Sequence, residues 1–61
     1  MATATQMRVS TLLARANVLA GARAKREDRP VTACPYDPRS PKALERFKAR
    51  YWIKGWNRSL R

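Results

Sequence analysis

The fold is decided by the stretch CPYDPRSPKALERFKARYWIKGW, which runs from Cys34 to Trp56. Three prolines lie in its first half, and they prevent a long helix there because proline has no backbone N–H to donate. The second half has no proline and interleaves aromatic residues with cations. Ser40 suits the N-cap of a helix, and Pro41 suits the first helical position. The stretch therefore predicts an irregular loop followed by a helix over residues 41–58.

Apolar residues in this predicted helix recur at three- and four-residue steps, the spacing of one helical face. The face expected to be inward consists of Ala43, Leu44, Phe47, Tyr51 and Gly55. A neighbouring strip consists of Trp52, Trp56 and Leu60. Because glycine has no side chain, Gly55 would let the other helix or a nucleic-acid backbone approach closely.

A helix is also predicted upstream, over about residues 7–27, and its end precedes Pro30. Its last turn carries several cations, which suit the negative end of the helix dipole. Gly21 costs about 1 kcal/mol relative to alanine but permits the close approach of another backbone. The expected inward stripe consists of Val9, Leu12, Leu13, Ala16, Ala20 and Ala24.

The predicted fold is all-α: one small domain over residues 1–61, with residues 1–6 flexible and an irregular, proline-containing linker between the two helices. We expect the helices to pack as a hairpin through the two stripes, with Cys34 and Tyr36 closing one end. A chain of 61 residues is marginally stable alone. Its single cysteine excludes an internal disulfide and the chain has no histidine, so helix packing and a partner must provide stability.

The charge indicates an anionic partner, since fourteen Lys and Arg oppose four Asp and Glu and give a net charge of +10. Phe47 and Tyr51 are interpreted as core, with stacking on unpaired bases as the alternative use of such rings. Packing is likewise preferred for Trp52 and Trp56. The residues expected to contact RNA are Arg8, Arg15, Arg26, Arg39, Lys42, Arg46, Arg50, Lys54 and Arg58.

The composition does not favour catalysis. No histidine is present as a base, the four acids are scattered, and Cys34 has no nearby base, so we interpret it as a small buried hydrophobe. A glycine-rich phosphate loop is also missing. We therefore expect no enzyme activity, no catalytic residue, no cofactor, no metal and no small-molecule substrate.

Targeting signals are weak. No run reaches the roughly 18 apolar residues of a membrane span, and no secretory signal is recognised. The acid-free segment of residues 1–26 has the composition of an organellar transit peptide. We nevertheless expect a cytoplasmic protein without a membrane partner.

The order Cys34-Pro35-Tyr36 followed by Trp52-Ile53-Lys54-Gly55-Trp56 resembles the ribosome modulation factor family, which shows Cys-Pro-Tyr, a basic segment and then Trp-x-x-Gly-Trp. Ala20-Gly21 resembles the Ala-Gly that ends the family's first helix. The likeness covers roughly residues 20–57. The linker before Cys34 and the segment before Trp52 are longer than in the family, and Asn57 stands where the family usually has arginine.

The resemblance implies a non-enzymatic protein of two helices that binds the small ribosomal subunit, its RNA and neighbouring ribosomal proteins. The implied site lies near the 3′ end of that RNA, where the messenger is selected. The implied effect is lower translation through hibernating ribosomes, as in a stress response, or redirected host translation if the gene belongs to a phage. The motif and core residues that carry over are Cys34, Pro35, Tyr36, Trp52, Gly55 and Trp56.

Two other functions remain open from the residues alone. A small DNA-binding or transcription-modulating protein would use the same cations. A membrane-active amphipathic peptide would use the Arg-flanked apolar stripe of the first helix.

Overall fold

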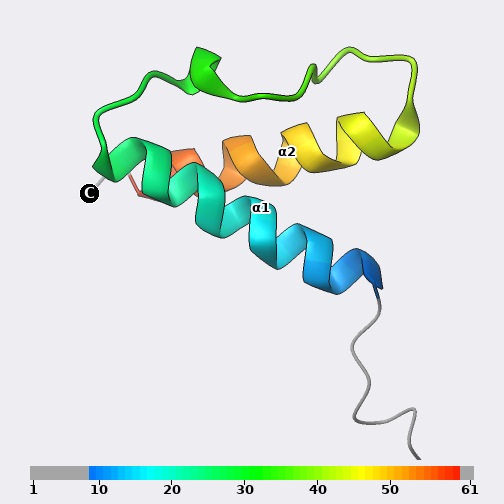
Figure 1. Ribbon diagram of the computed structural model, residues 1–61, viewed down its shortest axis with the longest axis horizontal. Coiled ribbons are helices and arrows are strands. Elements are labelled where there is room, and N and C mark those ends of the chain that lie inside the picture. The colour runs from blue at the N-terminus through cyan, green and yellow to red at the C-terminus, as the bar shows by residue number, and fades with distance from the viewer. Residues whose placement is uncertain (1–8, 60–61) are drawn as a thin grey trace, which may run out of the picture.

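The computed structural model describes residues 9–59 as two helices joined by an irregular linker (Figure 1). Helix α1 spans Val9–Arg26, the short 3-10 helix η2 spans Val31–Ala33, and helix α2 spans Ala43–Arg58. The predicted all-α fold and its irregular linker are confirmed. The flexibility predicted for residues 1–6 falls outside the described residues.

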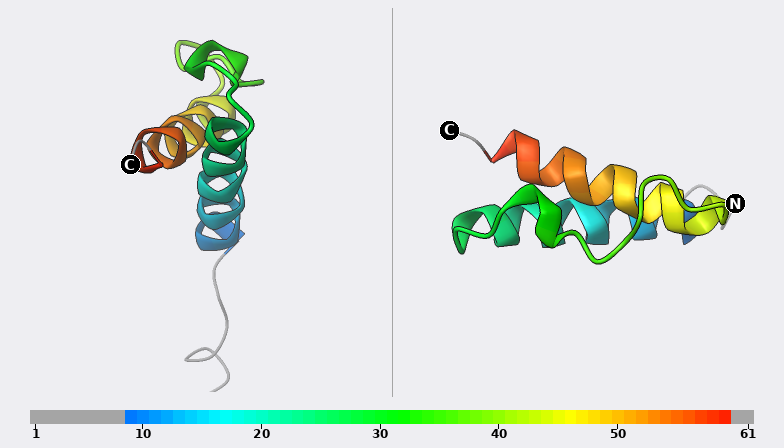
Figure 2. Two further views of the ribbon diagram at one scale, coloured as in Figure 1. Left: turned by 90° about the vertical axis from the view of Figure 1, so that its left-hand side faces the viewer. Right: turned by 90° about the horizontal axis from the view of Figure 1, so that it is seen from above.

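The two helices run in the same direction and cross each other, as the views in Figures 1 and 2 show. Near the end of α1, the ammonium of Lys25 lies 4.4 Å from the ring centroid of Trp56, which is near the end of α2. An antiparallel pair would place Lys25 near the start of α2 instead. The predicted hairpin is therefore wrong.

The linker makes this parallel arrangement possible because it is long enough to return to the start of α2. Residues 27–42 would span about 50 Å when extended, whereas α2 is only about 24 Å long. The linker runs back alongside the helix pair, and η2 lies within it (Figure 1). Proline-rich irregular backbone suits this path, since it needs neither a partner strand nor a helix.

The helices meet through their two glycines. A Cβ atom added to Gly21 would overlap the backbone carbonyl oxygen of Trp52, and one added to Gly55 would overlap that of Val18. Each glycine therefore lies directly against the backbone of the other helix, where Cα–H···O contacts form readily. The close approach predicted at both glycines is confirmed.

The glycine contact also determines which faces are inward, and the predicted stripes are wrong except at Ala24 and Gly55, which are buried. Val9 and Leu12 are 72% and 52% exposed, and Leu44 is 55% exposed. Ala16, Ala20 and Ala43 are exposed as well, while Leu13, Phe47 and Tyr51 are half-buried. The residues buried between the helices are Asn17, Gly21 and Ala24 of α1 and Ala49, Trp52 and Gly55 of α2.

The inward faces differ from the prediction because the helices pack through small residues and not through their leucines. A Leu-to-Leu seam would hold the helix axes apart, whereas glycine and alanine let the backbones touch. Turning each helix by roughly a quarter of a turn also brings Trp52 inward. Trp52 is only 4% exposed and is the one large side chain of this small core among residues 9–59. Its indole buries more surface than a leucine does.

One polar side chain lies within the helix interface without losing its hydrogen bonds. Asn17 is buried, and its side-chain amide donates to the carbonyl oxygen of Leu13 at 2.8 Å. This bond to the preceding turn satisfies the amide inside its own helix. Asn17 therefore contributes a flat, short side chain beside Gly21 at a small desolvation cost.

The start of α2 differs from the predicted cap. The helix begins at Ala43, and Lys42 is its N-cap without a side-chain hydrogen bond. Ser40 lies just ahead, buried, and its Oγ accepts from the Lys42 N–H at 3.1 Å. Arg46 Nη1 donates to the Ser40 carbonyl oxygen at 2.8 Å. The serine therefore shapes the turn before the helix, and α2 begins two residues later than Pro41.

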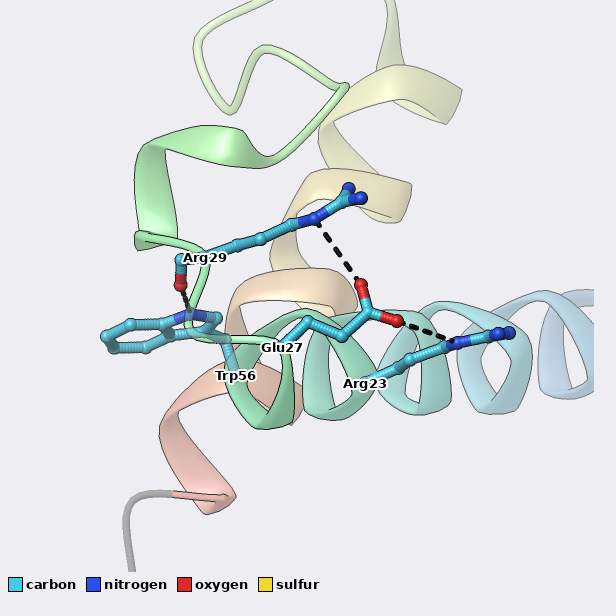
Figure 3. Close-up of polar contacts among 4 residues, drawn as sticks. All are labelled: Arg23, Glu27, Arg29 and Trp56. Atoms are coloured by element: carbon cyan, nitrogen blue, oxygen red, sulfur yellow. Dashed lines mark hydrogen bonds and ion pairs between the residues drawn. The ribbon is translucent and has the colours of Figure 1, made fainter.

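The other end of the linker is fixed by charges and by an indole. Asp28 has a φ of 61°, a left-handed conformation that ends α1. Glu27 pairs with Arg23 at 3.3 Å and with Arg29 at 3.4 Å, and the indole N–H of Trp56 donates to the Arg29 carbonyl oxygen at 2.8 Å (Figure 3). These contacts tie the first linker residues to both helices.

The glycine contact predicts an inverted response to alanine. In an ordinary helix interior, Gly→Ala stabilises by about 1 kcal/mol. Here we expect Gly55→Ala to destabilise by about 2 kcal/mol or more, because the new methyl group overlaps the Val18 backbone. Thermal unfolding followed by circular dichroism measures the change. Asn57→Ala, at an exposed position of the same helix, is the control and should not destabilise. A Gly55→Ala protein that melts at or above the wild-type temperature would refute the contact.

Candidate nucleic-acid interface

A row of cations follows the outer side of α2. It consists of Arg46, Arg50, Lys54 and Arg58, which recur every four residues and are all exposed. Four residues of α-helix rise by about 6 Å, so successive side chains of the row stand one above the other along the helix. This spacing is comparable to that of successive phosphates in a nucleic-acid strand. We call these four residues the cation row.

The members of the row differ in what else they contact. Arg46 is partly engaged by the linker, since its guanidinium donates to the Ser40 carbonyl oxygen. The ammonium of Lys54 lies 5.4 Å from the ring centroid of Tyr51, a cation–π contact that leaves its N–H groups available. Arg58 lies in the last turn, where a cation also suits the helix dipole.

The remaining predicted RNA contacts are distributed over the molecule. Arg39 and Lys42 are exposed on the linker just before α2, beside the start of the cation row. Arg15 and Arg26 are exposed on α1. Arg8 lies outside the described residues. The structure therefore brings Arg15 to the end of the cation row but does not gather all the described members of the set on one surface.

A groove lies between the two helices beside Gly55 and encloses about 580 Å³. The α1 side contributes Arg15, and the α2 side contributes Lys54 and Arg58. The complete lining is Ala14, Arg15, Val18, Leu19, Tyr51, Lys54 and Arg58. We call it the interhelix groove.

The Cys-Pro-Tyr part of the motif lies along the helix pair and does not close one end as predicted. Cys34 is a free thiol and half-buried, so its predicted burial is only partial. Pro35 is exposed. Tyr36 is half-buried, and the ammonium of Lys48, within α2, lies 5.5 Å from its ring centroid. These residues therefore hold the linker against the middle of α2.

The Trp-x-x-Gly-Trp part of the motif is structural in this fold. Trp52 fills the core, Gly55 contacts α1, and Trp56 is half-buried and bonds the linker. Packing, the interpretation preferred for both tryptophans, is confirmed for Trp52 and is partial for Trp56. The motif residues therefore hold α2 in its orientation against α1 and the linker.

The sequence pattern did not indicate several side chains that make long-range contacts or line the groove. Lys25 covers Trp56 and Lys48 covers Tyr36, and each contact joins segments far apart in the chain. Val18 and Leu19 line the interhelix groove but lie outside the predicted stripe. These contacts form only when the helices and the linker pack together, so no local signal could have found them.

Within residues 9–59, no three His, Cys, Asp or Glu side chains are grouped as a metal site would require. Neither described helix has the length and apolar character needed to cross a membrane. Comparisons with protein-family models, curated proteins and solved structures find no match to this chain.

The two arginines at the start of the row should differ in their effect on stability. We expect Arg46→Gln to lower the free energy of unfolding by about 1 kcal/mol, because the Ser40 carbonyl oxygen loses its charged donor. Arg50→Gln, an exposed neighbour that removes the same charge, serves as the control and should change stability by less than about 0.5 kcal/mol. Urea unfolding of both variants makes the comparison. Equal stabilities would contradict a structural role for Arg46.

Proposed function

We propose that this protein binds the small ribosomal subunit through its RNA and thereby lowers translation, without enzyme activity. The observation that carries the proposal is the cation row, four exposed cations at equal spacing along one side of a fixed helix. A phosphate backbone is the partner that such a row fits. Each phosphate that meets a cation releases condensed counterions, which drives the association.

The two glutamates support this interpretation because their contacts lie away from the row. Glu27 pairs with Arg23 and Arg29 at the end of α1. Glu45 accepts a hydrogen bond from the Asp37 N–H at 3.0 Å, on the linker side of α2. Because Glu27 and Glu45 contact other groups, they do not neutralise the cation row, and the row keeps a positive potential that can attract a partner.

The choice of ribosomal RNA over other polyanions rests on the resemblance to the ribosome modulation factor family. The motif that carries this resemblance holds α2 in place through Trp52, Gly55 and Trp56. The same residues therefore support both the fold and the presentation of the row. By that resemblance the site is near the messenger-selection region of the small subunit, the result is a hibernation-like state, and the setting is the cytoplasm of a cell or of a phage-infected host.

Sedimentation tests the proposal directly. In a low-salt sucrose gradient of cells that express the tagged protein, we expect the protein to travel with small subunits or larger ribosomal particles. Recovery only at the top of the gradient would contradict the proposal. A competition between purified small subunits and duplex DNA for the protein tests the DNA-binding alternative. Ribosome binding requires the protein to prefer the subunits over the duplex.

Binding to purified small subunits should be strongly salt-dependent. If about six phosphates are neutralised by the row and its neighbours, affinity should fall about a thousandfold between roughly 50 and 200 mM salt. Filter binding across that range gives the slope. A flat response would exclude phosphate contacts as the source of affinity.

The position of the cations should matter more than their number. We expect the double variant Arg50→Gln with Lys54→Gln to lower the salt slope by about two and to weaken binding at every salt concentration. The matched control, Arg23→Gln with Arg29→Gln, removes two charges that already pair with Glu27. Its fold should survive, since exposed ion pairs contribute little to stability. Equal losses in both variants would mean that only net charge acts.

A further inference from the structure

The interhelix groove combines an apolar floor with a charged rim. Ala14, Val18 and Leu19 of α1 and Tyr51 of α2 form the floor, while Arg15, Lys54 and Arg58 form the rim. We propose that this groove binds one unpaired nucleotide of an RNA strand, with the base against Tyr51 and the adjoining phosphate at Lys54 and Arg58. This inference rests on the proposed function and specifies what part of an RNA the protein recognises.

The tyrosine ring is held in place for such a contact. Tyr51 is half-buried, and its ring lies 4.9 Å from that of Phe47 with an interplanar angle of 49°. The Lys54 ammonium lies 5.4 Å from the centroid of the same ring, so a base that stacks on that face takes its place and leaves Lys54 beside the phosphate. Both aromatic residues lie beside the helix interface, because Gly21 and Gly55 occupy the interface itself. A ring with few accessible rotamers loses little entropy when a base stacks on it.

The charge of the rim selects an anion. Among the described residues that line the groove, none carries a carboxylate. The contrast is the groove between α1 and the linker, which is larger at about 730 Å³ but is lined by Glu27 as well as by Arg23 and Arg29. Lys54 and Arg58 beside an apolar floor place positive potential next to a flat apolar surface, which suits a phosphate attached to a base.

The groove is continuous with the cation row, and this continuity favours a nucleic-acid strand over a free anion. Lys54 and Arg58 belong to both. A strand whose phosphates follow the row from Arg46 reaches the groove at Lys54. A duplex keeps its bases stacked inside, so only an unpaired or bulged nucleotide can place its base on the floor.

The test compares two RNA probes on the wild-type protein. The first is a labelled single-stranded RNA of about ten nucleotides, and the second has the same backbone but no bases. Fluorescence anisotropy at fixed salt measures both affinities. We expect the abasic strand to bind about tenfold more weakly, since the loss of base stacking has that order of effect. Equal affinities would show that only the cations act and would overturn the proposal.

Two substitutions at one position locate the effect. Tyr51→Leu keeps an apolar side chain but removes the ring, and Tyr51→Phe keeps the ring. We expect Tyr51→Leu to lose about tenfold on the normal strand and nothing on the abasic strand, and Tyr51→Phe to bind both like wild type. Equal losses of Tyr51→Leu on both strands would overturn the assignment of the base to Tyr51. Circular dichroism checks that each variant folds. If Tyr51→Leu does not fold, the comparison of the normal and abasic strands on the wild-type protein decides the question.

The tests distinguish failure of the nucleotide site from failure of ribosome binding. If the protein sediments with small subunits but binds both probes equally, the nucleotide site is wrong and ribosome binding stands. If the protein remains at the top of the gradient but prefers the normal strand through Tyr51, the nucleotide site stands and the ribosomal partner is wrong.

Discussion

The structure depends on one contact, in which the backbone of each helix lies directly against a glycine of the other. Gly21 meets the carbonyl of Trp52, and Gly55 meets that of Val18. Close packing of this kind offsets the small apolar core, which among residues 9–59 contains Ala24, Ala49 and Trp52 as its buried hydrophobic residues. With so little side-chain surface to bury, the chain gains stability from backbone proximity and from a linker tied to both helices.

The functional surfaces follow from that contact. Because the glycines occupy the interface, Phe47 and Tyr51 lie beside it, half-buried, and Leu12 and Val9 are exposed. The same rotation leaves the cation row exposed along α2, and its members Lys54 and Arg58 also line the groove beside α1. One packing choice thus yields an exposed track of cations, and it sets a fixed aromatic ring beside the end of that track. The residues that resemble the ribosome modulation factor motif act mainly on the packing, and the exposed cations of α2 lie beside them.

The sequence predicted the elements well and their relation poorly. Prolines and helical periodicity located α1, the linker and α2 to within about two residues, because those signals are local. The close approach at the glycines also followed from their lack of a side chain. The direction of packing and the inward faces did not follow, because apolar periodicity favours Leu12 and Leu44 whereas backbone contact wins in the fold. The cation row was predictable from spacing, but the interhelix groove was not, since Arg15 lies beside Lys54 and Arg58 only once the two helices have packed.

Nuclear Overhauser effects in the free protein test the central contact most directly. The account predicts proton contacts from the Gly21 α-protons to Trp52 and Trp56, and from the Gly55 α-protons to Val18, before any RNA is added. It also predicts that Lys25 contacts the indole of Trp56. Absence of these contacts in a folded sample, or contacts from Lys25 to the first turns of α2, would contradict the parallel glycine-mediated packing on which the cation row and the groove depend.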